Sequence, residues 1–186
     1  MVGKQKKRFI LIFLLVLFIV WTFLILFVGP EVLITKIGVR NTYFIVFVLA
    51  TVGGVSSITG ASFLLTIVTF AGSGSNPFLL GLFGGIGIFI GDIWLYYIVH
   101  HSFKIIKEGQ NQNLLFIANK IEKLSTKKVL VLVYLYLGFT PFPSDFLIIA
   151  LSLSNISPSK LAPVILAGGL TLVTTIAYFG HVFLFL

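Results

Sequence analysis

Two carboxylic acids lie inside long apolar stretches of this chain and are its first candidates for chemistry. Asp145 stands between the apolar runs 129–139 and 146–153, and Asp92 stands within the glycine-rich run 78–99. An ionised carboxylate at the centre of a bilayer costs about 2.5 to 3.5 kcal/mol on insertion scales, so such residues generally face a cavity or a partner. A carboxyl group placed in this way can take up and release a proton. Both acids are therefore candidate proton-exchanging groups.

The residues just before Asp145 predict a turn between two half-helices. Pro141 and Pro143 stand two positions apart, and proline breaks a helix. In a bilayer this break suggests a hairpin that turns back before crossing, with its tip buried in protein or facing a water-filled cavity. The prolines shape the tip, while the hydroxyls of Thr140 and Ser144 can donate to a ligand or satisfy unwound backbone. Asp145 can act in the site, cap the second half-helix, or do both.

Asp92 belongs to a different element, a span rich in small residues. Tyr96 follows it by four positions and therefore shares its helix face. Asp92 can line the same cavity as Asp145, bond Tyr96, or satisfy an exposed backbone group of a hairpin. Small residues spaced four apart allow another helix to approach closely, and the pairs are Gly81/Gly85 and Gly87/Gly91.

Composition places these acids in an integral membrane protein. Of the 186 residues, 58% are hydrophobic and only 10% are charged, far from the balance of a soluble domain. The formal net charge of +8 would suggest nucleic acid for a soluble protein. Here the basic residues flank apolar runs, so membrane orientation and anionic lipid headgroups explain them better. The chain has no cysteine, which excludes disulfides, thiolate metal sites and a cysteine nucleophile.

Apolar runs and loops divide the chain into four parts. Residues 1–42 hold an uncleaved signal-anchor span, with a cytoplasmic N-terminus, and an external connection. Residues 43–101 and 129–186 each hold a broken apolar segment followed by a full span. Residues 102–128 form a cytoplasmic linker, with a basic amphipathic helix on the leaflet surface around 114–128. The predicted fold is all-α, with three transmembrane helices and two re-entrant hairpins, multi-pass in the cell membrane, with an external C-terminus.

The first broken segment carries hydroxyls in place of an acid. Three glycines and three hydroxyls lie between Gly53 and Gly60. Glycine leaves the backbone unrestrained, and hydroxyls can bond the backbone groups that an unwound helix frees. Ser56, Ser57 and Thr59 can therefore contact a headgroup or simply satisfy this backbone.

The distribution of basic residues favours hairpins over full crossings. If both broken segments turn back, every lysine and arginine except Lys36 and Arg40 is cytoplasmic. If both cross fully, the basic residues of 102–128 move outside, against the positive-inside rule. The two hairpins then enter from opposite sides.

An internal repeat supports the same topology. Residues 62–65 (Ser-Phe-Leu-Leu) resemble 145–148 (Asp-Phe-Leu-Ile), and each leads through a polar turn to a Gly-Gly pair, at 84–85 and at 168–169. This alignment predicts that the Gly-Gly pairs at 84–85 and 168–169 occupy equivalent positions in the two halves. Hairpins entering from opposite sides give inverted repeats, as in many secondary transporters.

Polar side chains on the last span have structural explanations. Thr171, Thr174, Tyr178 and His181 share one of its faces. His181 lies near the predicted outer end, where an interfacial histidine needs no special role.

Together these residues resemble the DedA family, also called the VTT or SNARE-associated Golgi protein group, over roughly residues 40–186. Residues 87–96 (Gly-Ile-Phe-Ile-Gly-Asp-Ile-Trp-Leu-Tyr) are similar to the family's glycine-rich span, with Gly91, Asp92 and Tyr96 at its motif positions. Residues 140–145 resemble its proline-and-acid re-entrant tip. The resemblance implies a lipid translocase that moves phospholipid or polyprenyl phosphate between leaflets, in several members apparently coupled to protons.

The chain also departs from the family pattern. Its first tip is neutral, its second has Asp145 with no arginine, and His100-His101 stand where Gly-Arg often follows the tyrosine. Arginine-based recognition of a phosphate therefore does not carry over.

The residues supply no positioned base for a nucleophile, so we expect no enzymatic activity, and we expect no cofactor and no metal. The resemblance implies membrane lipids, above all anionic phospholipid or polyprenyl phosphate, as partners. The sequence leaves open whether the protein forms a homo-oligomer. The alternatives are an ion- or proton-coupled small-solute transporter and a non-transporting assembly or stress factor. The chain lacks the Gly-x-Ser-x-Gly elbow of a serine hydrolase and the His-Glu-x-x-His motif of a zinc protease.

Overall fold

The computed structural model describes residues 38–53, 57–106, 117, 119–154 and 156–185, and its regular elements there are all helices. This confirms the all-α prediction for the described residues. The predicted signal-anchor span and Ser56 lie outside them. The helices are α3 (Val39–Gly53), α4 (Ser57–Gly72), α5 (Pro77–Ile106), α7 (Thr126–Phe139), α8 (Asp145–Ser152) and α9 (Pro158–Phe185).

Two of these helices are long and apolar enough to cross a membrane, namely α5 over Pro77–His100 and α9 over Pro158–Phe183. They match the spans predicted at 78–99 and 160–185. Only 39% and 33% of these stretches are buried inside the structure, whereas a core helix of a soluble protein is mostly buried. The remaining apolar surface suits contact with lipid.

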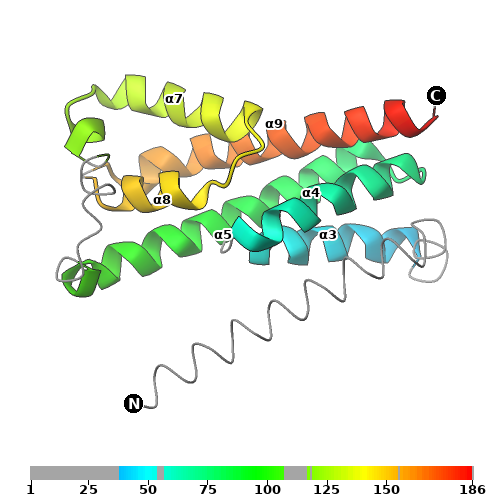
Figure 1. Ribbon diagram of the computed structural model, residues 1–186, viewed down its shortest axis with the longest axis horizontal. Helices are drawn as coiled ribbons and strands as arrows, with labels where there is room; N and C mark the ends of the chain where they lie inside the picture. The colour runs from blue at the N-terminus through cyan, green and yellow to red at the C-terminus, as the bar shows by residue number, and fades with distance from the viewer. Residues whose placement is uncertain (1–37, 54–56, 107–116, 118, 155, 186) are drawn as a thin grey trace, which may run out of the picture.

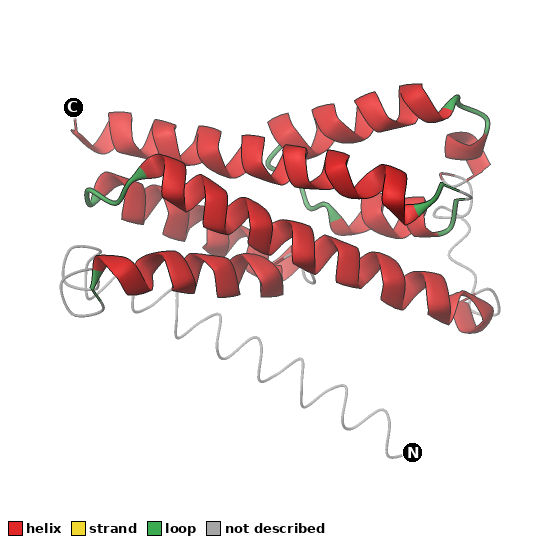
Figure 2. Cartoon of the chain, turned by 180° about the vertical axis from the view of Figure 1, so that it is seen from behind, coloured by secondary structure: helices red, strands yellow, loops and turns green. Residues whose placement is uncertain are grey.

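The long helices α5 and α9 lie side by side, and two pairs of short helices pack around them (Figures 1 and 2). Helices α3 and α4 extend from one end of the molecule, and α3 ends and α4 begins near the middle of its length (Figure 1). Helices α7 and α8 extend from the opposite end and also meet near the middle. Each short helix contacts a long one: α3 and α8 pack on α5, and α4 and α7 pack on α9.

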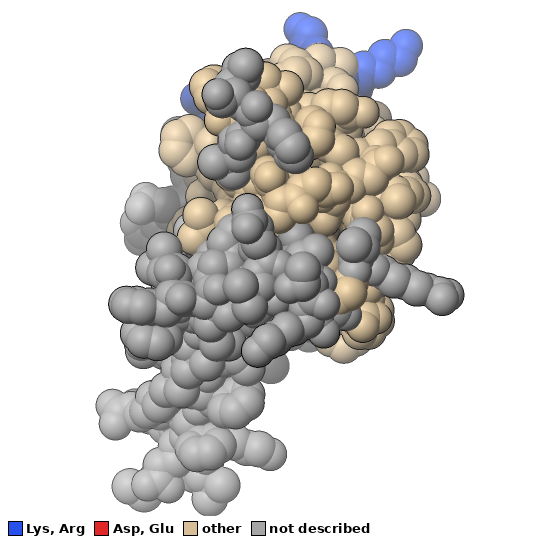
Figure 3. Space-filling model, turned by 90° about the vertical axis from the view of Figure 1, so that its right-hand side faces the viewer, with Lys and Arg blue, Asp and Glu red and all other residues tan. Residues whose placement is uncertain are grey.

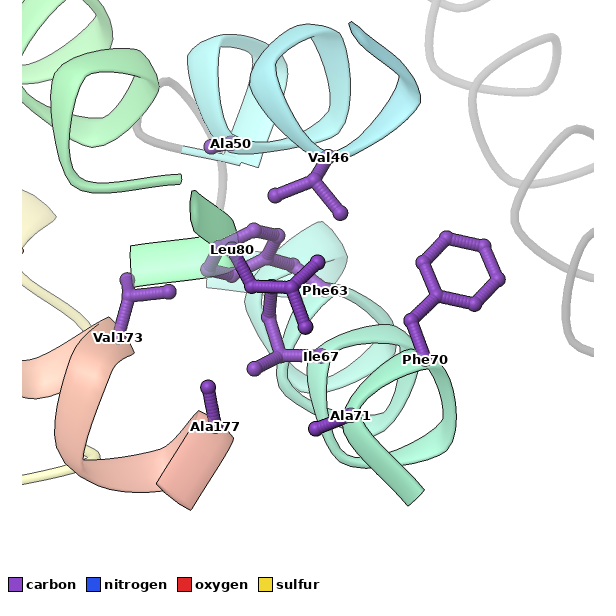
Figure 4. Packing of buried hydrophobic residues seen from close by; sticks show 9 residues of the cluster. All are labelled: Val46, Ala50, Phe63, Ile67, Phe70, Ala71, Leu80, Val173 and Ala177. Atoms are coloured by element: carbon purple, nitrogen blue, oxygen red, sulfur yellow. The ribbon is translucent and has the colours of Figure 1, made fainter. Parts of the chain in front are cut away.

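Two hydrophobic clusters hold these helices together. The first lies among α3, α4, α5 and α9 and is drawn in Figure 4. Its members are Val46, Ala50, Phe63, Ile67, Phe70, Ala71, Leu80, Val173 and Ala177. The second lies among α5, α7, α8 and α9 and consists of Tyr96, Val129, Val133, Leu137, Ile148, Leu151, Leu161 and Ile165. Each short pair therefore has its own core, built on one half of the α5·α9 pair.

Glycines bring the long helices into close contact, as their spacing predicts. A Cβ atom added to Gly85 would lie 2.7 Å from the Cα atom of Leu170 on α9, and one on Gly169 would lie 3.1 Å from the carbonyl oxygen of Gly85. Gly87 instead faces α3, where an added Cβ atom would lie 2.6 Å from the carbonyl oxygen of Phe47. Side chains at these positions would push the helices apart.

A short turn sets the start of α5. Gly74 adopts φ 89°, a left-handed conformation that glycine tolerates best. The Asn76 side chain then accepts hydrogen bonds from the backbone N–H groups of Phe78 and Leu79 at 3.0 and 3.3 Å. Pro77 occupies the first helical position, which needs no N–H donor. The predicted polar turn is thus a capped helix start.

The basic linker differs from the single surface helix expected at 114–128. Residues 117 and 119–122 are helical, but a turn follows at 123–125 and α7 begins at Thr126. Lys127 and Lys128 therefore belong to the first turn of α7, whose buried face starts at Val129. Because α7 packs its apolar side chains into the core, the chain turns at 123–125, between the exposed linker and this helix.

The described lysines gather at one end of the molecule. The lysines whose side chains are described are all exposed, on the linker, at the start of α7 and at the start of α9. Figure 3 views the molecule from the other end, where α4 joins α5, and blue side chains appear only at the far upper rim. These lysines are Lys120, Lys123, Lys127, Lys128 and Lys160.

Candidate functional site

The structure joins the two sequence motifs at a single contact. Asp92 lies on the apolar helix α5 with 0% exposure. The Ser144 hydroxyl, at the end of the α7–α8 tip, donates a hydrogen bond to Asp92 Oδ1 at 2.9 Å. The other carboxyl oxygen, Oδ2, is buried and has no hydrogen-bond partner among the described residues. Of the two structural roles open for Asp92, a bond to Tyr96 or to a hairpin backbone group, neither is observed among the described residues. Asp92 bonds a hairpin side chain instead.

Hydrogen bonds of Tyr136 and Thr140, which lie one helical turn apart, hold the tip. The Thr140 hydroxyl donates to the Tyr136 carbonyl oxygen at 2.6 Å, and the Thr140 backbone N–H donates to the same oxygen at 3.1 Å. The Tyr136 hydroxyl then donates to the Pro143 carbonyl oxygen at 3.0 Å. The two Thr140 bonds close the last turn of α7, and the Tyr136 hydroxyl ties Pro143 back to that turn. Tyr136 was not a sequence candidate, although its spacing of four from Thr140 places both on one face.

Asp145 occupies the first turn of α8, beside the Asp92–Ser144 contact. Ser144 precedes it as the N-cap residue but makes no side-chain cap, because its hydroxyl is turned to Asp92. Asp145 is half-buried, and a carboxylate in the first turn is favoured by the helix dipole. The sequence made Asp145 the leading candidate, but the structure buries Asp92 more deeply.

Exposed phenylalanines surround the polar tip. Phe139, Phe142 and Phe146 are 62%, 67% and 62% exposed. They lie before, within and after the tip, whereas Pro141 and Pro143 are also exposed and Thr140 is half-buried. The Asp92–Ser144 contact is therefore close to an apolar outer surface, not enclosed at the centre of the helices.

Tyr96 shares the buried face of Asp92 but bonds elsewhere. Its hydroxyl donates to the carbonyl oxygen of Ile156, in the connection between α8 and α9, at 2.9 Å. Its ring stacks on His100 at a centroid distance of 5.7 Å. Gly91, next to Asp92, is buried. Tyr96 thus ties α5 to the connection that follows α8, and an Asp92–Tyr96 bond is not observed among the described residues.

The candidates at the first tip lie elsewhere in the molecule. Ser57 and Thr59 belong to the first turns of α4, and their side chains, like Ser56, lie outside the described residues. On α9, the Thr171 hydroxyl lies 3.3 Å from the Tyr134 hydroxyl and links α9 to α7. His181, expected to have no special role, lies with Nδ1 3.2 Å from the Ala71 carbonyl oxygen. Because a carbonyl oxygen only accepts, His181 Nδ1 is the donor.

Matching contacts in the two halves fix how they correspond. His100 Nδ1 donates to the Ser152 carbonyl oxygen at 3.0 Å, as His181 does to Ala71. The offset is the same for donors and acceptors, 181 − 100 = 81 and 152 − 71 = 81. The helix starts Pro77 and Pro158 obey it too, since 158 − 77 = 81. The predicted matching of glycine pairs 84–85 and 168–169 is therefore wrong by three residues, because Gly-Gly pairs recur at helix contacts without marking the same position.

With this offset, the counterpart of the polar contact is apolar. Asp92 corresponds to Val173 and Ser144 to Phe63, and both counterparts lie against Gly84 and belong to the first core cluster. Among the described side chains, the polar pair is thus a feature of the second half.

The chemistry available at this site is proton exchange and hydrogen bonding. Asp92, Ser144 and Asp145 offer oxygen atoms, but the described residues contain no group of three histidine or acidic side chains that could hold a metal ion. Comparison with protein-family models, curated proteins and solved structures finds no match for this chain.

Proposed function

We propose that this protein is a membrane lipid translocase that moves the headgroup of a phospholipid or polyprenyl phosphate between leaflets past the α7–α8 tip. One observation carries the proposal: a fully buried carboxyl group, Asp92, bonds the hydroxyl of a proline-rich tip that lies among exposed phenylalanines. A polar group at membrane depth is costly unless it serves a pathway or a partner. A headgroup arriving from the lipid would find hydrogen-bonding groups there while its chains stay beside the phenylalanines.

The proposal includes three spans and two re-entrant hairpins of inverted topology. Helix lengths support it: α7 and α8 have 14 and 8 residues, and α3 and α4 have 15 and 16. At about 1.5 Å per residue, each is shorter than the roughly 30 Å of a hydrocarbon core. The equivalent contacts of the two halves, with each short pair starting from its own end, also support it (Figure 1).

The lysines support the orientation. They lie at the end from which α7 and α8 extend, so the positive-inside rule makes that end cytoplasmic. Exposed lysines near a leaflet attract anionic lipids by about 1 kcal/mol each. Lipid would thus be gathered on the side from which the polar tip is reached.

In this mechanism the Asp92–Ser144 contact is the part that changes. A phosphate headgroup competes for the Ser144 hydroxyl, and an ammonium headgroup competes for the carboxyl oxygens of Asp92. When Ser144 is displaced, the Asp92 carboxylate loses its hydrogen-bond donor. Taking up a proton then removes the negative charge that burial disfavours. Asp145, in the first turn of α8, is placed to exchange that proton with water or headgroup. Proton uptake and headgroup passage are coupled in this way.

Reconstitution into liposomes tests the function. Vesicles carrying fluorescent phospholipid or polyprenyl phosphate are assayed for transbilayer movement with the wild type, Asp92→Asn and the control Glu122→Gln, which alters an exposed acid on the linker. We expect the wild type to accelerate movement over empty vesicles, Asp92→Asn to lose at least tenfold, and Glu122→Gln to match the wild type. Normal movement with Asp92→Asn would refute its role. Solute flux without lipid movement would favour the small-solute transporter instead.

Single cysteines test the hairpin topology, because the chain contains none of its own. Lys123 precedes the α7–α8 pair in the sequence and Ser159 follows it, and both are exposed. Asn41 is exposed at the start of α3. If α7 and α8 form a re-entrant hairpin, cysteines at 123 and 159 react from the cytoplasmic side and a cysteine at 41 from the external side. Labelling of 123 and 159 from opposite sides would rule the hairpin out.

A further inference from the structure

The two histidine contacts occupy equivalent places at opposite ends of the molecule. Helices α8 and α4 are the second helices of the two short pairs, and their last carbonyl groups have no partner within the helix. Ser152 lies at the end of α8 and receives Nδ1–H of His100 from α5, at 3.0 Å. Ala71 lies near the end of α4 and receives Nδ1–H of His181 from α9, at 3.2 Å. Each long helix therefore binds the end of the short helix that belongs to the other half.

These contacts are placed where a donor matters. A last carbonyl group of a helix has no donor within the helix, so a side-chain donor adds a hydrogen bond there. The Ala71 carbonyl oxygen also accepts from the Gly74 backbone N–H at 3.3 Å, whereas the contact to Ser152 is reinforced by the Tyr96 bond to Ile156 nearby. Side chains from the long helices thus fix the outer end of each short helix.

The opposite end of α8 also has a polar contact to α5. That end carries Ser144, whose bond to Asp92 is the contact that the proposed function displaces. Helix α8 has eight residues, so its two ends lie about 12 Å apart. A helix fixed at one end and released at the other rotates about the fixed end.

We infer that His100 and His181 are paired positioning residues: each holds the outer end of one short helix on the opposing long helix, and α8 opens the Asp92 contact by rotating about its His100-bound end. The second clause rests on the proposed function. The first does not, because it concerns only how the helices are held. In the second half the rotation exposes a carboxyl group, and in the first half the same arrangement covers only Val173 and Phe63.

Spin labels on the cysteine-free chain test the inference. One pair replaces Trp94 on α5 and Phe146 on α8, both exposed, and the second replaces Leu65 on α4 and Phe179 on α9, also exposed. His100→Phe keeps the aromatic ring but removes the donor, and His100→Gln restores a donor. The same two substitutions at His181 form the matched set.

We expect His100→Phe to increase the displaced population of the 94–146 pair about fivefold, the change that a hydrogen bond of about 1 kcal/mol corresponds to. The 65–179 pair should stay unchanged. His181→Phe should do the reverse, and both glutamine variants should resemble the wild type. Unchanged distances in the phenylalanine variants, or equal changes in both pairs, would overturn the inference.

Lipid movement in the same vesicles separates the inference from the proposed function. If His100→Phe alters both the 94–146 distances and lipid movement, and His100→Gln alters neither, the rotation of α8 belongs to transport. If the wild type moves no lipid, the proposed function fails, while the distances still decide whether the histidines hold the helices. If distances change but the wild-type rate of lipid movement persists, the rotation about His100 is refuted as a transport step.

Discussion

The two halves of this molecule pack a short helix against a long one in a similar way, but the side chains at the equivalent contact are polar in one half and apolar in the other. In the second half, Asp92 on α5 meets Ser144 at the tip before α8. At the equivalent place in the first half, Val173 on α9 and Phe63 on α4 fill the space beside Gly84 with carbon. A polar pair is therefore not needed to hold a short helix pair on a long helix. The function proposed above gives the carboxyl group in the other half a role beyond packing.

The largest expected effect comes from placing an acid in the apolar half. Val173→Asp would bury a carboxylate with only apolar neighbours in the first cluster, and an uncompensated buried charge destabilises by about 3 to 5 kcal/mol. Thermal unfolding in detergent measures the loss, with Val173→Ala as the control for lost volume. Equal stability of the two variants would mean that the halves tolerate acids alike, and the comparison would fail.

Equivalent glycines should respond equally in the two halves. Gly87 and Gly168 are related by the same offset, and an added Cβ atom would lie 2.6 Å from the Phe47 carbonyl oxygen and 2.7 Å from the Leu137 Cβ atom, respectively. Alanine at either position should destabilise by about 1 to 3 kcal/mol, the usual cost of overpacking.

Gly138→Ala is the control for this pair, since its nearest neighbour would be 3.5 Å away, and it should unfold like the wild type. A large difference between the Gly87 and Gly168 variants in the same unfolding assay would contradict the equivalence of the α3·α5 and α7·α9 contacts.

Removing the donor to Asp92 should cost less. Ser144→Ala deletes the one hydrogen bond of Asp92 Oδ1 and should lower stability by about 1 kcal/mol, because headgroup or water can replace part of it. Ser159→Ala, at an exposed hydroxyl, is the matched control. Transport of lipid should change in Ser144→Ala and not in Ser159→Ala; identical behaviour of both would indicate that the contact is incidental.

The smallest expected effect concerns Asp145. Asp145→Asn removes a favourable charge from the first turn of α8, worth about 0.3 to 1 kcal/mol. Comparing its lipid movement with that of Asp92→Asn ranks the two acids directly. A loss larger for Asp145→Asn than for Asp92→Asn would restore Asp145 as the principal group.

The sequence was sufficient for elements whose signals are local. Prolines at 141 and 143 ended α7 within one residue of the predicted limit, and the polar turn before Pro77 predicted the start of α5. The spacing of Gly81 and Gly85 predicted the close approach of another helix, since a missing side chain has a direct geometric effect.

What the sequence left open depended on contacts between distant segments. Fifty-two residues separate Asp92 from Ser144, and neither residue type specifies the other as its partner. The ranking of Asp145 above Asp92 followed from the prolines beside it, but burial depends on which helix faces the core. The match of 62–65 to 145–148 lies two residues out and that of the Gly-Gly pairs three, because short, mainly apolar runs and glycine pairs match at several offsets. His100 and His181 bond backbone carbonyl groups, which any residue can provide, so no pattern of side chains indicated them.

The short second helix of the α7–α8 pair would have a consequence for the bilayer in the proposed topology. Helix α4 has 16 residues and α8 only 8. If α8 lies along the bilayer normal, the protein presents about 12 Å of helical apolar length next to it, where lipid chains need more. Hydrophobic mismatch of this kind is relieved by local thinning of the bilayer, at a fraction of a kcal/mol per Å. Lipids beside α8 would then have a shorter distance to travel than those beside α4, so the asymmetry of two helix lengths would lower the barrier before any side chain takes part.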